Sequence, residues 1–319
     1  MKLKVKAVLS GLATYIPVYN YMRATGGTES ARYCYSVWLR HLVHAHRFCR
    51  QGGVPGVVAE LGPGDSIGIG LAALLTGAEK YFALDIVRYS DLQSNLEIFD
   101  ELVRLFEDRA AIPGHEEFPA VYPELESYAF PHDLLSDDTL NAALDAARLA
   151  DIRSSLEQVG NAGSRIQYVV PWADPAVIVE NSVDMIYSQA VLEHIDDLAT
   201  VYAAMRRWLK PDGLMTHQID YGCHGKADTW NGHWTYSDPV WKLVVGRRPY
   251  LLNRIPHSEH MRQMQENGFE IVFENRIRAD SELRNRHLAA RFRGLSEHDM
   301  TTRCAFIVAT VPGLDERAN

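Results

Sequence analysis

A glycine turn between two short apolar runs constrains this fold more than any other feature of the sequence. The apolar run 57–61 leads into Gly62-Pro63-Gly64, a helical pattern follows over 67–75, and a second apolar run covers 81–85. Glycines permit a sharp turn, and a helix that begins after them offers free backbone N–H groups to a ligand. Strand, turn, helix and strand in this order predict a βαβ unit and therefore a parallel sheet.

The spacing of apolar residues predicts further strands and helices that alternate along the chain. This alternation indicates an α/β fold with a mostly parallel sheet. We expect the further strands at 166–170, 183–188, 214–219, 269–273 and 305–310, and helices at 31–50, 91–109, 137–159, 197–209 and 258–267.

We interpret residues 1–319 as a single domain, because a chain of this length can bury one large core and carry a cap. Residues 1–53 are predicted to be an N-terminal helical segment. The interval 88–165 is too long for an ordinary loop between strands, which predicts a helical insertion. Residues 220–257 are rich in Trp, His, Tyr and Arg and are predicted to form a cap over the substrate.

Charge and composition exclude several classes of function. The formal net charge is −9, which argues against a general nucleic-acid binder, because such a protein needs a basic surface. The four cysteines lie far apart without a CxxC pair, so we expect reduced thiols rather than a zinc or disulfide framework. No apolar run is long enough for a transmembrane helix, so no membrane span is predicted.

The first residues place basic side chains before apolar ones, as a weak signal peptide does. The apolar stretch is short, is interrupted by Gly11, and is followed by Pro17 rather than by a small-residue cleavage site. We therefore predict a cytoplasmic location.

Acidic residues around the glycine turn indicate which ligand it binds. Asp85 ends the second strand, where a carboxylate can accept hydrogen bonds from both hydroxyls of a ribose. Glu60 and Asp65 flank the turn, and their charges suit a cationic ligand with an ammonium and a sulfonium group better than a pyrophosphate. The spacing from Gly64 to Gly68 is one residue too long for a dinucleotide fingerprint, which disfavours an NAD-dependent oxidoreductase.

Three motifs, in order and at strand ends, make the chain similar to class I S-adenosylmethionine (SAM)-dependent methyltransferases. Glu60-Leu61-Gly62-Pro63-Gly64 with Asp85 resembles the first two motifs of that family. The segment 184–194 resembles its fourth-strand motif, and Lys210-Pro211-Asp212-Gly213-Leu214 resembles the turn before its fifth strand. The resemblance spans roughly 55–220 and is interrupted by the insertion. It implies a Rossmann-like, seven-stranded, mostly parallel sheet with helices on both faces, and SAM as the cofactor.

The resemblance also implies an adenosyl pocket at the carboxyl ends of the strands. Its cofactor-binding residues would be Glu60, Gly62 and Gly64 for the methionine part, Asp85 for the ribose, Ile86 and the Trp172-Ala173-Asp174 turn for the adenine, and Ser188 and Gln189 near the methyl donor.

The side chains that activate the acceptor should follow the fourth and fifth strands. A hydroxyl acceptor needs a base within reach of its proton, and a neutral imidazole suits that task near neutral pH. The candidate catalytic residues are His194, Asp220 and His224. With His217 and His233, Asp220 and His224 could also gather a divalent metal, but their spacing matches no compact ligand motif, so no metal site is predicted.

The cap supplies aromatic and basic side chains for the acceptor. Aromatic platforms suit a sugar or another polar ring, and arginines suit a phosphate or a carboxylate. The candidate substrate-binding residues are His217, Trp230, His233, Arg247 and Arg254. His217 lies within a predicted strand, which also favours a structural role.

The segment 216–220 is similar to methyltransferases linked to surface polysaccharide synthesis. We therefore predict methyl transfer to a hydroxyl of a small molecule or a glycan-linked acceptor. A nucleic-acid methyltransferase and a non-catalytic partner subunit of the same fold are the alternatives. A homodimer is left open.

Overall fold

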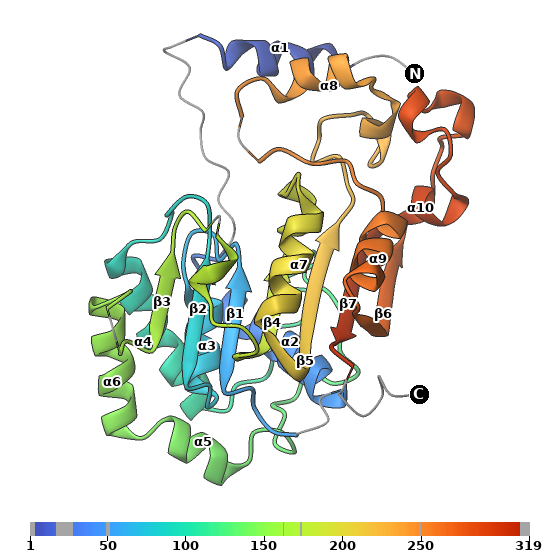
Figure 1. The fold of residues 1–319 in the computed structure, drawn as a ribbon. Coiled ribbons are helices and arrows are strands. Elements are labelled where there is room, and N and C mark those ends of the chain that lie inside the picture. Colours follow the sequence, from blue (N-terminus) through green and yellow to red (C-terminus); the bar gives the residue numbers. More distant parts are fainter. Residues whose placement is uncertain are drawn as a thin grey trace.

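The computed structural model describes residues 4–16, 28–48, 52–161, 163–172, 174–248 and 250–312. Its centre is a seven-stranded sheet in the order β3-β2-β1-β4-β5-β7-β6 (Figure 1). Neighbouring strands are parallel except for β7, which is antiparallel to both β5 and β6. The strands are β1 (Val57–Leu61), β2 (Lys80–Leu84), β3 (Ile166–Val169), β4 (Val183–Gln189), β5 (Leu209–Asp220), β6 (Glu270–Arg278) and β7 (Thr302–Thr310).

Helices cover both faces of the sheet, and each face has its own apolar core. One core joins the sheet to α2 (Ala31–Phe48), α3 (Gly68–Leu75), α4 (Leu92–Glu107), α5 (Asp137–Ala143) and α6 (Ala146–Glu157). The other core joins it to α7 (Leu198–Trp208) and α9 (His257–Glu266). Such two-sided burial explains why the strands read as nearly continuous apolar runs.

Helix α3 lies unusually close to β2, and glycine makes that approach possible. A Cβ atom at Gly70 would stand 2.1 Å from the ring of Tyr81, and one at Gly68 would stand 2.5 Å from Cys34 Sγ. Both distances are shorter than any van der Waals contact. The glycines of this segment therefore serve the packing of helix on sheet as well as the turn before it.

The insertion after β2 contains helices α4, α5 and α6, and residues 108–136 between them form no regular element. This irregular stretch is held from inside by Arg40 of α2, whose guanidinium donates to the carbonyl oxygens of Pro113, Val121 and Pro123 at 2.6–3.2 Å. Ser36 donates to the Pro113 carbonyl as well, at 2.7 Å. A buried guanidinium thus satisfies backbone acceptors that a helix or strand would otherwise satisfy.

A second group of elements lies above the carboxyl ends of the parallel strands (Figure 1). It contains α1 (Val5–Ala13), α8 (Asp238–Val245) and α10 (Glu297–Thr301), together with irregular segments of 221–256 and 280–296. Two small apolar clusters stabilise it, one between α1 and α8 and one around Trp234, Leu288 and Phe292. Within the described ranges, none of the helices is long and apolar enough to cross a membrane.

The predicted fold class is confirmed, but several element boundaries differ from the periodicity. The helix expected at 137–159 is two helices, α5 and α6, and strands β6 and β7 are longer than expected, at Glu270–Arg278 and Thr302–Thr310. Strand β5 begins at Leu209, five residues early, because Lys210-Pro211-Asp212-Gly213 forms a bulge within the strand rather than a turn before it. The pairing with β4 accordingly skips from Val183–Leu209 to Met185–Leu214. Helix α8 was not predicted within the cap.

Candidate active site

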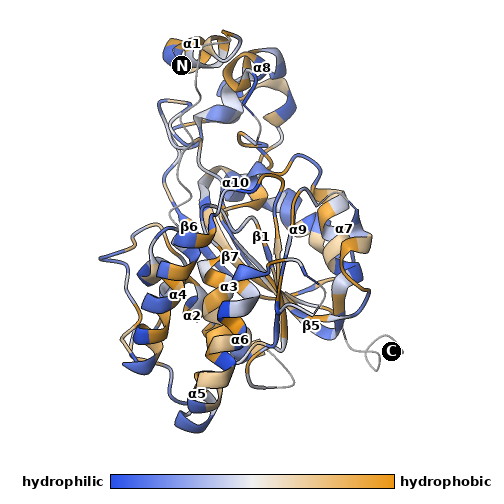
Figure 2. Cartoon of the chain, turned by 90° about the vertical axis from the view of Figure 1, so that its left-hand side faces the viewer, coloured by the Kyte–Doolittle hydropathy of each residue, from blue (hydrophilic) through white to orange (hydrophobic). Residues whose placement is uncertain are grey.

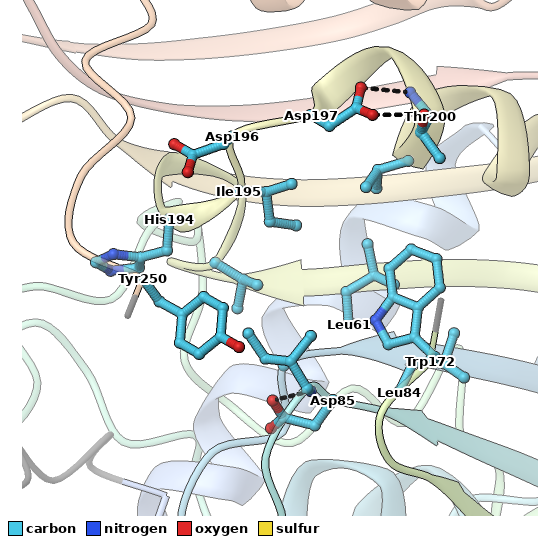
Figure 3. Close-up of a pocket in the computed structure, with 14 residues that line it drawn as sticks. Leu61, Leu84, Asp85, Trp172, His194, Ile195, Asp196, Asp197, Thr200 and Tyr250 are labelled. Carbon is cyan, nitrogen blue, oxygen red and sulfur yellow. Dashed lines mark hydrogen bonds between the residues drawn. The ribbon is translucent and has the colours of Figure 1, made fainter. Parts of the chain in front are cut away.

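A cavity of about 300 Å³ opens at the carboxyl ends of β1, β2 and β4 (Figure 3). This volume is at the low end of the range of about 300–1,000 Å³ typical of small-molecule sites. Its walls are largely apolar, with a few polar groups among them. The lining residues are Leu61, Gly62, Leu84, Asp85, Ile86, Trp172, Val191, His194, Ile195, Asp196, Asp197, Thr200, Val201 and Tyr250.

The glycine turn forms one edge of the cavity. Gly62 and Gly64 have φ of +63° and +76°, in the left-handed region that side chains other than glycine rarely adopt. A Cβ at Gly62 would also lie 2.7 Å from the methyl groups of Val191, which follows β4. The turn therefore packs against Val191, in the segment that leads to His194.

Asp85 lies at the floor of the cavity, as the sequence predicts (Figure 3). Its Oδ1 accepts a hydrogen bond from the Ile86 N–H at 2.7 Å, which fixes the carboxylate at the end of β2. Burial raises its pKa, and the backbone N–H groups of Ile86, Val87 and Gly64 oppose that shift. The Trp172 N–H donates to the Asp85 carbonyl at 3.0 Å, so the exit of β3 is tied to the same point. Asp85, Ile86 and Trp172 thus share one wall.

The other half of the predicted adenine turn lies elsewhere. Asp174 is exposed and its carboxylate accepts from the Ala176 N–H at 2.8 Å, which caps a short helical turn. Ala173 lies outside the described residues. A contact of Asp174 with an adenine remains a prediction.

Glu60 does not line the cavity; its side chain is buried against Tyr81 and Tyr187, on the face of the sheet that α2 and α3 cover. Its side chain accepts hydrogen bonds from Tyr81 Oη at 2.5 Å and from Tyr187 Oη at 3.2 Å. Burial raises its pKa to about 8, although the two tyrosine hydrogen bonds oppose the shift. The predicted role with the methionine part of SAM would have to act through the turn rather than by direct contact.

Ser188 and Gln189 belong to a buried polar network behind the cavity. Ser188 Oγ lies 2.8 Å from His217 Nδ1, and Gln189 Oε1 lies 3.1 Å from His41 Nε2. Gln189 also donates to Gln218. Burial lowers the pKa of His217 to about 3, so its imidazole is neutral at ordinary pH. A place for Ser188 and Gln189 near the methyl donor stays a prediction.

The three candidate catalytic residues are brought together on one side of the cavity. His224 Nε2 lies 3.1 Å from Asp220 Oδ2, and the His224 ring centroid lies 5.4 Å from that of His194, which lines the cavity. Burial favours a higher pKa for Asp220, but its hydrogen bonds with His224 and the Gly222 N–H outweigh burial, and the pKa lies below its usual value. Burial lowers the pKa of His194 to about 4. The arrangement is a carboxylate–imidazole pair next to a neutral imidazole.

Three non-glycine residues on this side of the cavity have a strained, left-handed backbone conformation. Ala190, His224 and Tyr250 have φ of +55°, +44° and +58°. Non-glycine residues in this region cost about 1–3 kcal/mol each and are enriched at functional sites. Figure 3 shows Tyr250 and His194 on the same side of the cavity.

Sequence reasoning did not identify Tyr250 or the cavity residues Asp196, Asp197 and Thr200. The last two carry a recognisable signal, because Asp197 caps α7 by accepting from the Thr200 N–H at 3.1 Å. That pattern marks the start of a helix at the cavity. No local pattern marks Tyr250, because only the packing of the cap brings it there.

The predicted substrate-binding residues are not found at the cavity. His217 and His233 are buried, and Trp230 donates through Nε1 to the Asp280 carbonyl at 2.9 Å. Arg254 is buried between Trp241 and Phe292 and pairs with Asp238 at 2.5 Å. Arg247 is exposed on the outer surface of the cap beside Tyr15. Their contact with an acceptor stays a prediction.

In the part of the chain that the structure describes, one group of side chains has the spacing of metal ligands, His257, Glu274 and His298. His257 Nε2 lies 2.9 Å from Glu274 Oε1, and its Nδ1 lies 3.2 Å from His298 Nε2. The contact with Glu274 and the hydrogen bond with His298 therefore involve opposite nitrogens of His257. It lies apart from the residues that line the cavity.

Residues 134–216, about a quarter of the chain, match the model of a methyltransferase domain. The match covers α5, α6, β3, β4, α7 and most of β5, and the glycine turn and Asp85 precede it. No curated protein sequence matches the chain.

Several solved structures are similar at low identity. A SAM-dependent methyltransferase from Mesorhizobium loti is 14% identical, with 81% of this chain and 91% of that one covered and a TM-score of 0.38. SAM-dependent methyltransferases from Methanosarcina mazei give 12% identity, coverage of 85% and 97%, and a TM-score of 0.44. A putative methyltransferase of Haloferax volcanii, in complex with the Trm112 methyltransferase activator, is 16% identical, with 88% of this chain and 94% of that one covered and a TM-score of 0.39. Similarity at this level carries no information on substrate or partner.

The methyltransferase-domain match supports the predicted enzyme class, a SAM-dependent methyltransferase, and with it the predicted cofactor. The residues of the cavity fit such a cofactor, because an apolar enclosure with a carboxylate at the end of β2 suits an adenosine.

Proposed function

We propose that this chain transfers the methyl group of SAM to a hydroxyl group of a small molecule or a glycan-linked acceptor. The observation that carries the proposal is the Asp220–His224 pair beside the cavity that Asp85 and the glycine turn enclose. Methyl transfer to an oxygen needs both parts, a site for the cofactor and a base for the acceptor proton.

The cofactor site would use the wall formed by Asp85, Ile86 and Trp172. The Asp85 carboxylate would accept the ribose hydroxyls, and the Ile86 and Trp172 side chains would border the adenine. When bound, SAM supplies an activated methyl group to a nucleophile held in line with it. The chain's remaining task is to orient the acceptor and to remove its proton.

The proton would pass to His224. Its Nε2 is engaged by Asp220, so the carboxylate orients the ring and stabilises the imidazolium that forms when Nδ1 takes a proton. His194 stays neutral because burial holds its pKa near 4, and it lines the cavity beside His224. We assign it to hydrogen bonding with the acceptor rather than to the role of base.

A hydroxyl acceptor explains why the site contains the Asp220–His224 pair, which can remove a proton. A neutral amine can attack an activated methyl group without prior loss of a proton, whereas a hydroxyl is a weak nucleophile until its proton is removed. The cap above the cavity, with Tyr250 at its wall, would then select the acceptor.

The cofactor part is tested by calorimetry with SAM, its demethylated product and NAD. We expect binding of SAM and its product and none of NAD, and we expect Asp85→Ala to abolish SAM binding. Asp138→Ala removes an exposed aspartate of α5, far from the cavity, and is the matched control. Unchanged SAM affinity in Asp85→Ala would refute the cofactor assignment.

The acceptor part is tested with labelled SAM, fractionated extract and mass spectrometry of the labelled product. His224→Asn should slow methyl transfer by about 10²–10⁴-fold, the usual contribution of a general base, while SAM affinity changes little. Equal loss of transfer and of SAM affinity would make His224 structural. A labelled product that is a nucleic acid or an amine would contradict the proposed acceptor.

A further inference from the structure

Helices α1 and α8 lie side by side at one end of the molecule, opposite α5 (Figures 1 and 2). They approach each other through small residues. A Cβ at Gly11 would stand 1.9 Å from the Leu243 carbonyl oxygen, and one at Gly246 would stand 2.2 Å from the Gly11 carbonyl oxygen. The side of α1 that faces α8 is therefore its glycine side, with Ala7 buried beside it.

The opposite side of α1 and the turn that follows it is apolar and exposed. Val5, Leu9, Leu12 and Ile16 have exposed fractions of 61%, 59%, 43% and 57%. Their spacing of four, three and four residues aligns them along one side of a helix. Leu243 of the neighbouring helix α8 is exposed as well, at 44%. An amphipathic helix normally buries this side, so its exposure indicates a binding surface.

The charge around this surface is opposite in sign to that of the whole chain. Residues 1–28 and 239–258 contain neither Asp nor Glu, whereas the chain carries a net charge of −9. Lys6 of α1, Lys242 of α8 and Arg247, which follows α8, are exposed. The Arg247 guanidinium also lies over the half-exposed ring of Tyr15, 5.0 Å from its centroid.

Hydrogen bonds hold α1 in this position. The Arg247 N–H donates to Thr14 Oγ1 at 2.8 Å, and Arg248 Nη2 donates to Ser10 Oγ at 2.7 Å. Lys4 Nζ donates to the Gly225 carbonyl at 3.0 Å. The surface is thus formed before any partner arrives, and its binding carries no cost of folding a helix.

We propose that this surface, made of Val5, Leu9, Leu12, Ile16 and Leu243 with Lys6, Lys242 and Arg247, docks on an anionic lipid bilayer. Apolar side chains on one side of a short helix, with basic groups at the border, are the features of helices that lie in the plane of a membrane interface. The basic groups would face anionic head groups. A second copy of this chain fits less well, because the same lysines and arginine would then face each other.

The test uses the full chain and co-sedimentation with vesicles. One set of vesicles is phosphatidylcholine alone, and the other contains about one third anionic phosphatidylglycerol. We expect binding to the anionic vesicles to be at least about tenfold tighter, and to weaken as salt rises. A Val5→Ser/Leu9→Ser double variant should lose binding by about tenfold or more.

The matched control is Val179→Ser/Leu92→Ser, which changes the same residue types outside α1 and α8. The exposed fractions of Val179 and Leu92 are 76% and 46%. It should bind vesicles as the unaltered chain does. Both double variants should keep the thermal midpoint and the SAM affinity of the unaltered chain, because all four side chains lie outside the cavity. Vesicle binding needs no SAM, so a failure of the proposed methyl transfer is recognised separately.

Three results would overturn the proposal. One is absence of binding to anionic vesicles, and another is equal loss of binding in the control variant. The third is occupation of the surface by a protein. This would appear as a dimer that Val5→Ser/Leu9→Ser converts to a monomer, or as binding to an acidic polypeptide such as polyglutamate without binding to vesicles.

Discussion

Replacing Glu60 by Gln should stabilise the fold, and the gain should grow as the pH rises. The Glu60 carboxyl is 1% exposed and accepts hydrogen bonds from Tyr81 and Tyr187. A Gln side-chain oxygen can accept both hydrogen bonds in the same place. The substitution therefore removes the titrating proton and leaves the packing nearly unchanged.

The size of the effect follows from the two pKa values of Glu60. The carboxyl ionises near 4.5 in an unfolded chain, and burial raises its pKa to about 8 in the fold. Between these values the folded state holds a proton that the unfolded state has released. Stability is therefore lost as the pH rises through this window, at about 1.4 kcal/mol per pH unit, with a ceiling of about 5 kcal/mol.

Urea denaturation of both proteins at about pH 5.5 and about pH 7.5 measures the effect. The difference in unfolding free energy between Glu60→Gln and the unaltered chain should increase by about 3 kcal/mol over that interval. Other titrating groups cancel in the difference. Glu157→Gln, at an exposed position of α6, should change the unfolding free energy by less than about 0.5 kcal/mol at either pH. A difference for Glu60→Gln that does not vary with pH would refute the reasoning.

Two further predictions concern the cavity. Gly62→Ala should lower the unfolding free energy by about 2–5 kcal/mol in thermal denaturation, because it combines left-handed backbone strain with a 2.7 Å approach to Val191. Gly163 has φ of +88° and open space around it, so Gly163→Ala should lose only the contribution of the strain. Equal losses of unfolding free energy in the two variants would disprove the contact with Val191. His194→Asn should leave the acid limb of the pH–rate profile in place, because burial already keeps the pKa of His194 near 4. If His194→Asn moves that limb and His224→Asn does not, His194 is the base.

Local patterns predicted the half of the site that lies on the parallel strands. The apolar runs and the glycine turn placed β1, α3, β2 and Asp85 correctly, because burial on both sides of a sheet leaves a strong local signal. Helix α8 also left a signal that was not used, since Ser237 precedes Pro239 and the apolar pair Trp241 and Val244.

Other features depend on contacts between distant segments and have no local signature. The direction of the Glu60 side chain is set by Tyr81 and Tyr187, which lie on the two strands that flank β1. The pairing of His41 with Gln189 joins residues 148 positions apart. The presence of Tyr250 at the cavity requires the whole cap to be in place. Reasoning from periodicity cannot reach such arrangements, because it reads only neighbours along the chain.

We expect Arg40 and the irregular stretch of the insertion, residues 108–136, to change together in evolution. The guanidinium has three carbonyl partners in that stretch, and those carbonyls have no ladder of their own. A relative that shortens residues 113–123 would leave a buried charge without acceptors, so position 40 should change in the same lineage. A lysine could not replace it, because a single ammonium cannot reproduce the planar fork that spans three carbonyl oxygens. The long loop is therefore tied in evolution to one residue of α2, and an engineer who trims it must redesign both.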